Sequence, residues 1–272
     1  MSKTWFITGT SRGFGRRFAE AALERGDNVS ATARNPEVLS DLAEKYGAAV
    51  LPISLDVTDR DQMFAAVAAT HEKFGQLDVM VNNAGYALNG TVEEITPELL
   101  REQLETNLFG VLHGTQAALP IMREQGSGHI IQTSSFGGVV SFPTLGGYNA
   151  SKWALEGLTD ALAQEVAAFG IKVTLIEPAP FLTDFFNTSA VQADENPAYD
   201  GLRERFAAAR AGQNIPEPVG FGPAILKLVD AEKPPLRVLF GEFPTQYVPG
   251  IYQQRLDTWN DWKDLALAAE GK

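Results

Sequence analysis

The sequence predicts a single α/β domain, in which a doubly wound parallel sheet of about seven strands carries helices on both faces. Short apolar runs alternate with amphipathic helical patterns along the chain, and this alternation is typical of a parallel sheet. A glycine-rich turn joins the first strand to the first helix. The chain has 272 residues, of which 44% are hydrophobic, so it is long enough for one large domain with its own core.

The expected elements follow one another in regular order. Strands are expected at 3–8, 28–33, 49–54, 78–81, 128–134, 171–177 and 236–240. Helices are expected at 13–25, 36–46, 59–74, 97–125, 148–169, 197–211 and 222–230. Four helices are followed by glycines that suit a left-handed helix end, at Gly26, Gly75, Gly126 and Gly170. No linker or repeat interrupts the pattern, so residues 1–272 are expected to form one domain, with 216–223 as an internal loop.

The first strand leads directly into a glycine-rich turn. Residues 3–8 are followed by Gly9-Thr10-Ser11-Arg12-Gly13-Phe14-Gly15, and a helical pattern begins there. This unit is typical of a Rossmann-type dinucleotide-binding fold, because glycines let the backbone approach a pyrophosphate at the helix N-terminus. The spacing is G-x-x-x-G-x-G, which differs from the commoner G-x-G-x-x-G. A glycine turn without a ligand is the alternative interpretation.

A tyrosine and a lysine lie four residues apart, at Tyr148 and Lys152. On a helix this spacing places both on one face, one turn apart. A free tyrosine has a pKa of about 10, and a neighbouring ammonium lowers that pKa because it favours the phenolate. Such a tyrosine can give a proton to a carbonyl oxygen and later recover it. Taken alone, the pair is better explained as part of an ordinary surface helix, because this spacing of tyrosine and lysine occurs often.

Five motifs in order make the chain resemble the short-chain dehydrogenase/reductase family. They are Thr8-Gly9 through Gly15, Asn82-Asn83-Ala84-Gly85, Asn107, Ser135, and the pair Tyr148 and Lys152. The resemblance runs from residue 3 to about residue 184, and it implies a Rossmann-type fold with a nicotinamide cofactor. One motif departs from the family pattern P-G-x-x-x-T, because Ala179 stands at the glycine of Pro178 to Thr183.

The resemblance implies a role for each candidate catalytic residue. Tyr148 would act as the general acid in the reducing direction, and Lys152 would bind the nicotinamide ribose. Lys152 and the positive nicotinamide ring together would lower the Tyr148 pKa towards 7. Ser135 would hold the substrate oxygen. Asn107 would support a water chain that reaches Lys152, or alternatively it is a polar residue that bends its helix.

The end of the second strand indicates which dinucleotide binds. An acid there binds the 2′-hydroxyl of NAD, whereas a basic residue accommodates the 2′-phosphate of NADP. Ala33 stands at the acidic position, Arg34 follows it, and Arg12 lies in the glycine turn. A guanidinium suits a phosphate because it donates two parallel hydrogen bonds. NADP(H) is therefore predicted over NAD(H), with two ordinary surface arginines as the alternative.

The resemblance extends cofactor binding to other parts of the chain. Asp56 and Val57 match the family's adenine-binding pair, although Asp56 is also suited to begin a turn before the next helix. The remaining residues that the resemblance assigns to the cofactor, besides Tyr148 and Lys152, are Gly9, Ser11, Gly13, Phe14, Gly15, Asn83, Ala84, Gly85, Pro178 and Thr183.

The segment at about 181–215 is expected to form a variable lid over the substrate. Its aromatic residues are Phe181, Phe185, Phe186, Tyr199 and Phe206. The residues predicted to line the substrate pocket are Phe136, Phe142, Leu145 and Phe185. They favour an apolar or aromatic carbonyl or alcohol substrate, although the aromatic residues are equally suited to form a small core within the lid.

A C-terminal extension at about 241–272 follows the last strand. Leu256, Trp259, Trp262 and Leu265 have helical spacing there. The extension could cover the substrate cleft or contact another subunit, but packing against its own domain is the preferred interpretation.

Composition excludes several classes of function. There is no cysteine, so disulfides and thiolate chemistry are excluded, and three separated histidines (His71, His113 and His129) indicate no metal site. The net charge of −12 argues against nucleic acid and anionic membranes as partners. No signal pattern or membrane-spanning run is recognised, so a cytoplasmic location is expected. The resemblance implies a homodimer or a homotetramer, with helices 97–125 and 148–169 at a dimer contact.

These features favour one function over two alternatives. The preferred function is NADPH-dependent reduction of ketones or aldehydes to alcohols, reversible as a secondary-alcohol dehydrogenase. The same fold and tyrosine–lysine pair also serve epimerases and dehydratases. The third interpretation is a non-catalytic protein that binds NADP and senses redox state; it has no need of the proton donor at Tyr148.

Overall fold

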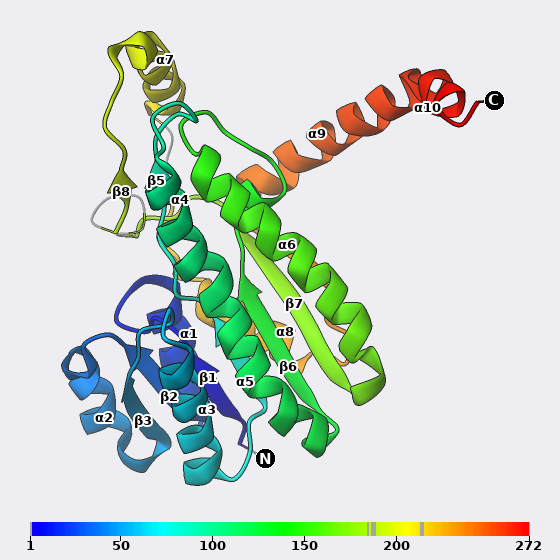
Figure 1. The fold of residues 1–272 in the computed structure, drawn as a ribbon. Coiled ribbons are helices and arrows are strands. Elements are labelled where there is room, and N and C mark those ends of the chain that lie inside the picture. Colours follow the sequence, from blue (N-terminus) through cyan, green and yellow to red (C-terminus); the bar gives the residue numbers. More distant parts are fainter. Residues whose placement is uncertain (1, 184, 186–188, 213–214, 272) are drawn as a thin grey trace.

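The computed structural model describes residues 2–183, 185, 189–212 and 215–271. Within them, seven parallel strands form one sheet in the order β3-β2-β1-β4-β6-β7-β9 (Figure 1). Their bounds are β1 Thr4–Ile7, β2 Asn28–Ala33, β3 Val50–Ser54, β4 Val79–Asn82, β6 Gly128–Thr133, β7 Ile171–Pro178 and β9 Arg237–Phe240. The predicted fold class and the seven predicted strands are confirmed.

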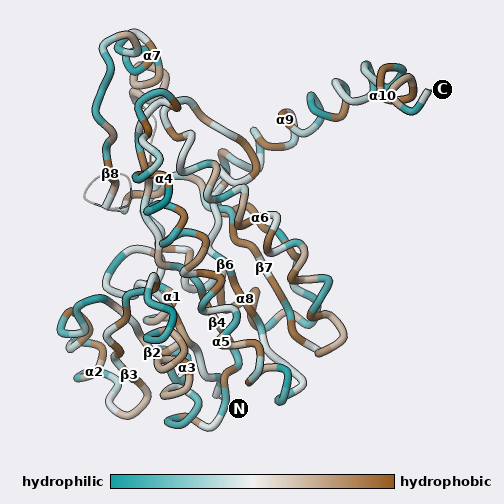
Figure 2. Tube along the Cα trace, in the orientation of Figure 1, coloured by the Kyte–Doolittle hydropathy of each residue, from teal (hydrophilic) through white to brown (hydrophobic). Residues whose placement is uncertain are grey.

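Helices cover both faces of the sheet. One face carries α1 (Gly13–Glu24), α2 (Ser40–Tyr46) and α8 (Phe221–Asp230), and the other carries α3 (Arg60–Phe74), α5 (Gly110–Gln125) and α6 (Gly146–Val166). Each face has its own apolar core, centred on Trp5 and Phe18 on the first face and on Phe6 and Met80 on the second. Hydrophobic residues gather along the strands, as expected for a parallel sheet buried on both faces (Figure 2).

The order of the strands fixes where a ligand can bind. Strand β1 lies between β2 and β4, so the chain builds the sheet outwards on one side of β1 and then on the other. Such a reversal leaves a crevice outside the carboxyl ends of the central strands, and dinucleotides bind there in this fold class. The glycine turn after β1 and the Asn83 loop after β4 both lie at this edge.

A smaller structure lies beyond that edge. Strand β5 (Leu88–Asn89) pairs with β8 (Val191–Gln192), and α4 (Pro97–Leu104) and α7 (Asp200–Arg210) accompany them. Neither short strand was predicted, because two-residue runs carry no periodicity. Helix α7 begins later than predicted, after the 3₁₀ turn η7 (Pro197–Tyr199) that Asn196 caps. Phe186 of the predicted lid lies outside the described residues.

The remaining differences between prediction and structure are local. The predicted helix 97–125 is interrupted by a π-helical turn, η3 (Glu105–Phe109), between α4 and α5. The predicted helix 36–46 starts as a 3₁₀ turn, η1 (Pro36–Leu39). The predicted loop 216–223 ends early because α8 starts at Phe221, and Pro223 is tolerated in a first helical turn that needs no N–H.

The C-terminal extension forms a helical arm that was predicted incorrectly. Helices α9 (Glu242–Asp261) and α10 (Lys263–Ala269) run away from the domain (Figure 1). Helix α9 packs through Val248 and Ile251 against the cluster around Phe136, and Arg255 further along it donates to Val139 O. Trp259, Trp262 and Leu265 are 70%, 63% and 61% exposed. The predicted packing of the apolar stripe against its own domain is therefore wrong, because the straight helix carries it out of reach.

The helices carry no membrane signal. Over the described residues, none of them is long and apolar enough to cross a bilayer.

The burial of His129 in β6 predicts that the stability of the folded protein depends on pH. Its Nε2 donates to Thr174 Oγ1 at 2.9 Å, and that hydroxyl donates to Pro235 O. Burial lowers the pKa of His129 from 6.5 to about 3. The unfolded chain therefore takes up a proton that the folded chain does not as pH falls below 6.5. The free energy of unfolding is expected to drop by about 2 kcal/mol between pH 7 and pH 5 through this residue.

Urea unfolding of the wild type and of His129→Gln at both pH values measures this contribution. Between pH 7 and pH 5, the free energy of unfolding of His129→Gln is expected to fall by about 2 kcal/mol less than that of the wild type. An equal drop in both proteins would show that His129 is not responsible.

Candidate active site

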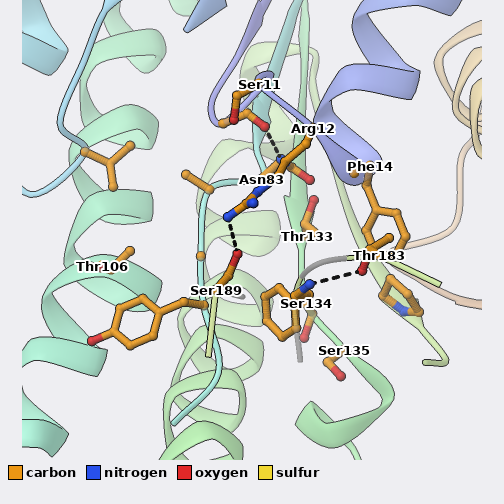
Figure 3. Close-up of a pocket in the computed structure, with 18 of the residues that line it drawn as sticks. Ser11, Arg12, Phe14, Asn83, Thr106, Thr133, Ser134, Ser135, Thr183 and Ser189 are labelled. Atoms are coloured by element: carbon orange, nitrogen blue, oxygen red, sulfur yellow. Dashed lines mark hydrogen bonds between the residues drawn. The ribbon is translucent and has the colours of Figure 1, made fainter. Parts of the chain in front are cut away.

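A cavity of about 510 Å³ opens at the carboxyl edge of the sheet. Its walls come from the turn after β1, the ends of β2 and β3, the loop after β4, the end of β6, the start of α6 and the segment after β7. Figure 3 shows residues from these elements converging on one space. All predicted cofactor residues except Gly15 line it, namely Gly9, Ser11, Arg12, Gly13, Phe14, Arg34, Asp56, Val57, Asn83, Ala84, Gly85, Tyr148, Lys152, Pro178 and Thr183.

Glycine is required at specific positions of the turn. Gly9 and Gly13 have φ angles of +70° and +62°, which L side chains rarely adopt. A Cβ atom at Gly15 would lie 2.3 Å from Gly9 O and 2.5 Å from Asn83 Nδ2. Gly15 thus permits the close packing that holds the turn, although it does not itself line the cavity. The residue that precedes α1, Arg12, provides no side-chain cap for the N–H groups of the first helical turn.

The turn is attached to the loop that follows β4. Thr8 Oγ1 accepts hydrogen bonds from Asn83 N at 2.8 Å and Ala84 N at 2.9 Å. Asn83 Nδ2 donates to Thr8 O and Gly9 O at 2.9 and 3.1 Å. The predicted shaping role of Asn83 therefore has a specific physical basis, since its amide fixes the glycine turn on the neighbouring strand.

Tyr148, Lys152 and Ser135 meet at the cavity wall. Tyr148 and Lys152 lie one turn apart on α6, and Lys152 Nζ is 5.9 Å from the centre of the Tyr148 ring. Lys152 Nζ donates to Thr133 O at 2.8 Å. Ser135 caps the 3₁₀ turn η4 (Phe136–Gly138), where its Oγ accepts from Gly137 N at 3.0 Å. All three side chains are buried.

Burial governs the ionisation of these groups. It raises the pKa of Tyr148 above its ordinary value of 10, and a hydrogen bond with Ser135 opposes that rise. In the polypeptide by itself desolvation of the phenolate dominates, and the lowering of the Tyr148 pKa by Lys152 together with the nicotinamide ring stays a prediction. Burial also lowers the pKa of Lys152 to about 8, against the attraction of Glu156. Tyr148 is therefore protonated at neutral pH, in the form of a proton donor.

Asn107 lies behind the cavity wall, in the π-helical turn. Its Nδ2 donates to Tyr86 O at 3.0 Å and to Ser151 Oγ at 3.1 Å, and its Oδ1 accepts from Tyr86 N at 3.1 Å. A Cβ atom at Gly85 would lie 2.9 Å from that Oδ1. Asn107 thus fixes the loop after β4 to α6, and it is Thr106 that lines the cavity. The water chain to Lys152 stays a prediction.

The two predicted phosphate ligands, Arg12 and Arg34, occupy the mouth of the cavity, and both are exposed. Arg12 donates to Ser189 Oγ at 2.6 Å, and the two side chains point toward each other in Figure 3. Asp56 accepts hydrogen bonds from Thr58 N and Thr58 Oγ1. These bonds form the turn before the next helix, which was the alternative role predicted for Asp56. Asp56 nevertheless also lines the cavity.

The motif with the unusual alanine keeps its place at the cavity. Ala179 N donates to Phe240 O at 2.8 Å, so this segment continues the pairing of β7 with β9. Thr183 accepts weakly from Phe185 N at 3.4 Å. Pro178, Ala179 and Thr183 all line the cavity, so the substitution of alanine for glycine does not displace the segment.

Only part of the predicted substrate pocket lines the cavity. Phe136 and Phe185 do, and the Phe185 ring meets the Tyr148 ring edge-on at 5.7 Å. Phe142 and Leu145 do not; they pack in the small apolar cluster that includes Tyr148. The same cluster includes Phe185, so the place of Phe142 and Leu145 in the substrate pocket stays a prediction.

Comparison with known proteins identifies the family. The sequence model described as short chain dehydrogenase matches residues 3–194. The chain belongs to the short-chain dehydrogenase family. It is 43% identical to the oxidoreductase BOA17 of Botryotinia fuckeliana, over 99% of this chain and 100% of that protein. It is 38% identical to the 3-ketodihydrosphingosine reductase of Bacteroides thetaiotaomicron, over 86% of each chain.

Solved structures agree with this assignment. A short-chain dehydrogenase from Streptomyces avermitilis superposes with a TM-score of 0.91 and 40% identity, covering 98% of both chains. A Burkholderia phymatum member in complex with NAD superposes with a TM-score of 0.78 and 26% identity, covering 91% of this chain and 92% of that one. A Burkholderia cenocepacia member in complex with NADP superposes with a TM-score of 0.76 and 25% identity, covering 96% of this chain and 97% of that one. This short-chain dehydrogenase is thus an NAD(P)-dependent oxidoreductase by family.

The cavity of this short-chain dehydrogenase fits such a dinucleotide. The backbone at Gly9 and Gly13 leaves room for close approach of a phosphate, and the uncapped start of α1 offers N–H groups to it. Basic side chains line the end beyond β2, and the buried Tyr148 and Lys152 line the other end. The residues present therefore match the polar and apolar parts of the molecule that they would hold.

Sequence reasoning missed several residues of the cavity. Tyr86, Thr106 and Ser189 line it, and a second phenol at Tyr86 is notable because burial raises its pKa too. Tyr86 directly follows the Asn82–Gly85 motif, so its position was available as a signal. Ser189 was not recognisable, because it meets Arg12 from 177 positions away in the sequence.

Proposed function

We propose that this short-chain dehydrogenase reduces ketones or aldehydes to alcohols, with NADPH as its preferred cofactor. The observation that carries this proposal is the buried, protonated Tyr148, which lies with Ser135 and Lys152 on the wall of the cavity that contains the glycine turn. The cofactor supplies a hydride when bound. The relative from Bacteroides thetaiotaomicron, which is named as a reductase of a keto compound, supports the same reaction class.

Each of the three side chains has a distinct task. The Ser135 hydroxyl holds the substrate oxygen beside Tyr148, and the Tyr148 hydroxyl gives its proton to that oxygen. Burial opposes this transfer because a phenolate is poorly solvated there, so Tyr148 keeps its proton until the substrate oxygen becomes a stronger acceptor. Lys152 compensates the charge that remains on Tyr148 afterwards and binds the nicotinamide ribose. Asn107 fixes the loop that shapes the pocket.

The substrate is an apolar or aromatic carbonyl compound. Phe136 and Phe185 provide apolar walls beside Tyr148. Phe185 also limits the access of water to the Tyr148 ring, which it contacts edge-on. The segment at about 181–215 would act as the lid and the arm at 241–272 as an extension outside it. A homodimer or homotetramer stays a prediction, supported by exposed apolar side chains on η3 and α6 (Phe109, Trp153 and Leu158).

Absorbance of NADPH, followed while aliphatic and aromatic ketones are added, tests the reaction. Oxidation of NADPH is the expected result, with NADH run in parallel. An epimerase would leave the total amount of reduced cofactor unchanged, and a dehydratase would consume its substrate without a net change in the cofactor. A redox-sensing protein would bind NADPH tightly without consuming it. Any of these three results would overturn the proposal.

Arg34 is expected to determine the cofactor preference. In Arg34→Leu the dissociation constant for NADPH should rise about 10–100-fold, because a charged hydrogen bond to the 2′-phosphate contributes about 1.5–3 kcal/mol. Binding of NADH should change little. Fluorescence titration of both cofactors measures this.

Arg17→Leu is the matched control, since Arg17 is an arginine of α1 that does not line the cavity. Equal weakening of NADPH and NADH in Arg34→Leu would contradict the assignment of Arg34 to the 2′-phosphate.

A further inference from the structure

A group of charged side chains lies behind the cavity, between α6, β7 and β9. Glu156 is 5% exposed and Glu177 is 3% exposed. Arg237 Nε is 3.0 Å from Glu156 Oε2 and 3.9 Å from Glu177 Oε1, and Arg237 Nη2 is 3.4 Å from Asp160 Oδ2. Two acids are thus buried around one arginine, and Asp160 lies at its exposed side. The proposed reaction has no role for any of them.

Glu156 reaches the active site through Ser134. The Ser134 hydroxyl donates to Glu156 Oε1 at 2.5 Å, and Ser134 lines the cavity directly before Ser135. One helical turn earlier on α6, Lys152 donates to the carbonyl of Thr133. Lys152 and Glu156 therefore hold two consecutive residues at the end of β6 from the same face of α6.

The backbone at Gly138 packs closely against the serine–glutamate contact. A Cβ atom at Gly138 would lie 2.7 Å from Ser134 Oγ and 3.2 Å from Glu156 Oε1. Glycine at this position is therefore needed for the serine–glutamate contact. A carboxylate that served only as a partner of Arg237 would need no such clearance.

We propose that Glu156 is a positioning residue, whose carboxylate, anchored by Ser134 and Arg237, holds the end of β6 in place and keeps Lys152 in its charged form. This inference rests on the proposed function for the task of Lys152. Its physical basis is the attraction between a buried carboxylate and a buried ammonium one turn away on the same helix, which is weakly screened by solvent.

The ionisation of the group agrees with this role. Burial, together with the negative charge of the neighbouring Glu156, raises the pKa of Glu177 to about 8, so Glu177 holds a proton at neutral pH. Burial raises the pKa of Glu156 as well, but Ser134 and Arg237 oppose that rise. Glu156 in turn opposes the fall in the pKa of Lys152. The titratable and charged groups that face this cluster are Tyr148, Lys152 and Asp160 on α6, Glu177 on β7, Arg237 on β9, and Tyr252 and Arg255 on α9.

Titration of the Lys152 amine tests the inference without substrate or cofactor. The protein is labelled on lysine with ¹³C and ¹⁵N, and the signal missing from Lys152→Arg assigns the resonance. Glu156→Gln keeps an oxygen for Ser134 but loses the charge. In this variant the midpoint of the Lys152 titration is expected to fall by about one pH unit. Asp160→Asn is the matched control, because it loses an acid that also pairs with Arg237 but lies at the surface. Its midpoint is expected to stay at the wild-type value.

An unchanged midpoint in Glu156→Gln would overturn the inference. Glu156→Asp should give an intermediate midpoint, and if Glu156→Gln does not fold, an unchanged midpoint in Glu156→Asp overturns it instead. In the ketone assay, kcat of Glu156→Gln should fall about fivefold at pH 8 and little at pH 6. A merely structural role would lower kcat equally at both. Absence of ketone reduction in the wild type would reject the proposed function while the titration still decides on Glu156.

Discussion

Replacing Tyr148 by phenylalanine is expected to lower kcat for ketone reduction by roughly 10²–10⁴-fold, the usual contribution of a positioned general acid. The variant keeps the ring that packs against Phe185 and loses only the hydroxyl. Burial holds the proton on Tyr148 at neutral pH, so the wild type begins each turnover with its acid in place. Stopped-flow or steady-state oxidation of NADPH with a reactive ketone measures the loss.

Tyr86→Phe provides the matched control, because Tyr86 is the second phenol that lines the same cavity. Its kcat is expected to stay close to that of the wild type. Binding of NADPH to Tyr148→Phe should also persist, since the glycine turn is untouched. A severe loss in Tyr86→Phe with little loss in Tyr148→Phe would assign the proton donor to Tyr86 and reject the proposed mechanism.

Replacing Gly15 by alanine is expected to disrupt the dinucleotide end of the cavity. The added methyl group would lie 2.3 Å from Gly9 O and 2.5 Å from Asn83 Nδ2, so the turn and its attachment to the β4 loop must move apart. Overpacking of this kind costs about 1–3 kcal/mol. The melting temperature should fall, and the dissociation constants of both NADPH and NADH should rise at least tenfold.

Gly157→Ala is the control for this substitution. Gly157 lies in the middle of α6, and apart from its own helix backbone a Cβ atom there would meet no heavy atom within 4 Å. Alanine is the better helix former by about 0.5–1 kcal/mol, so this variant should be at least as stable as the wild type. Unchanged cofactor binding in Gly15→Ala would show that the turn has room that the packing does not indicate.

The sequence by itself determined the fold class and the identity of the candidate site. Strand–helix alternation requires a parallel sheet, and the carboxyl ends of its central strands lie at one edge. Residues that follow those strands, such as Gly9, Asn83 and Ser135, therefore lie together at this edge of the sheet. Their convergence does not depend on the exact residue at which each strand ends. Tyr148 and Lys152 were predictable for a different reason, because a helix fixes the relation between positions four apart.

Only the tertiary structure decided what depends on burial and on distant contacts. The raised pKa of Tyr148 follows from its complete desolvation, which no local pattern reports. Phe142 and Leu145 pack in the apolar cluster that includes Tyr148, and the arm formed by α9 and α10 extends away from the domain. In the link from Ser134 through Glu156 to Arg237, the last two residues are 81 positions apart in the sequence. Such contacts arise when β9 pairs with β7, and they exist only once the sheet is complete.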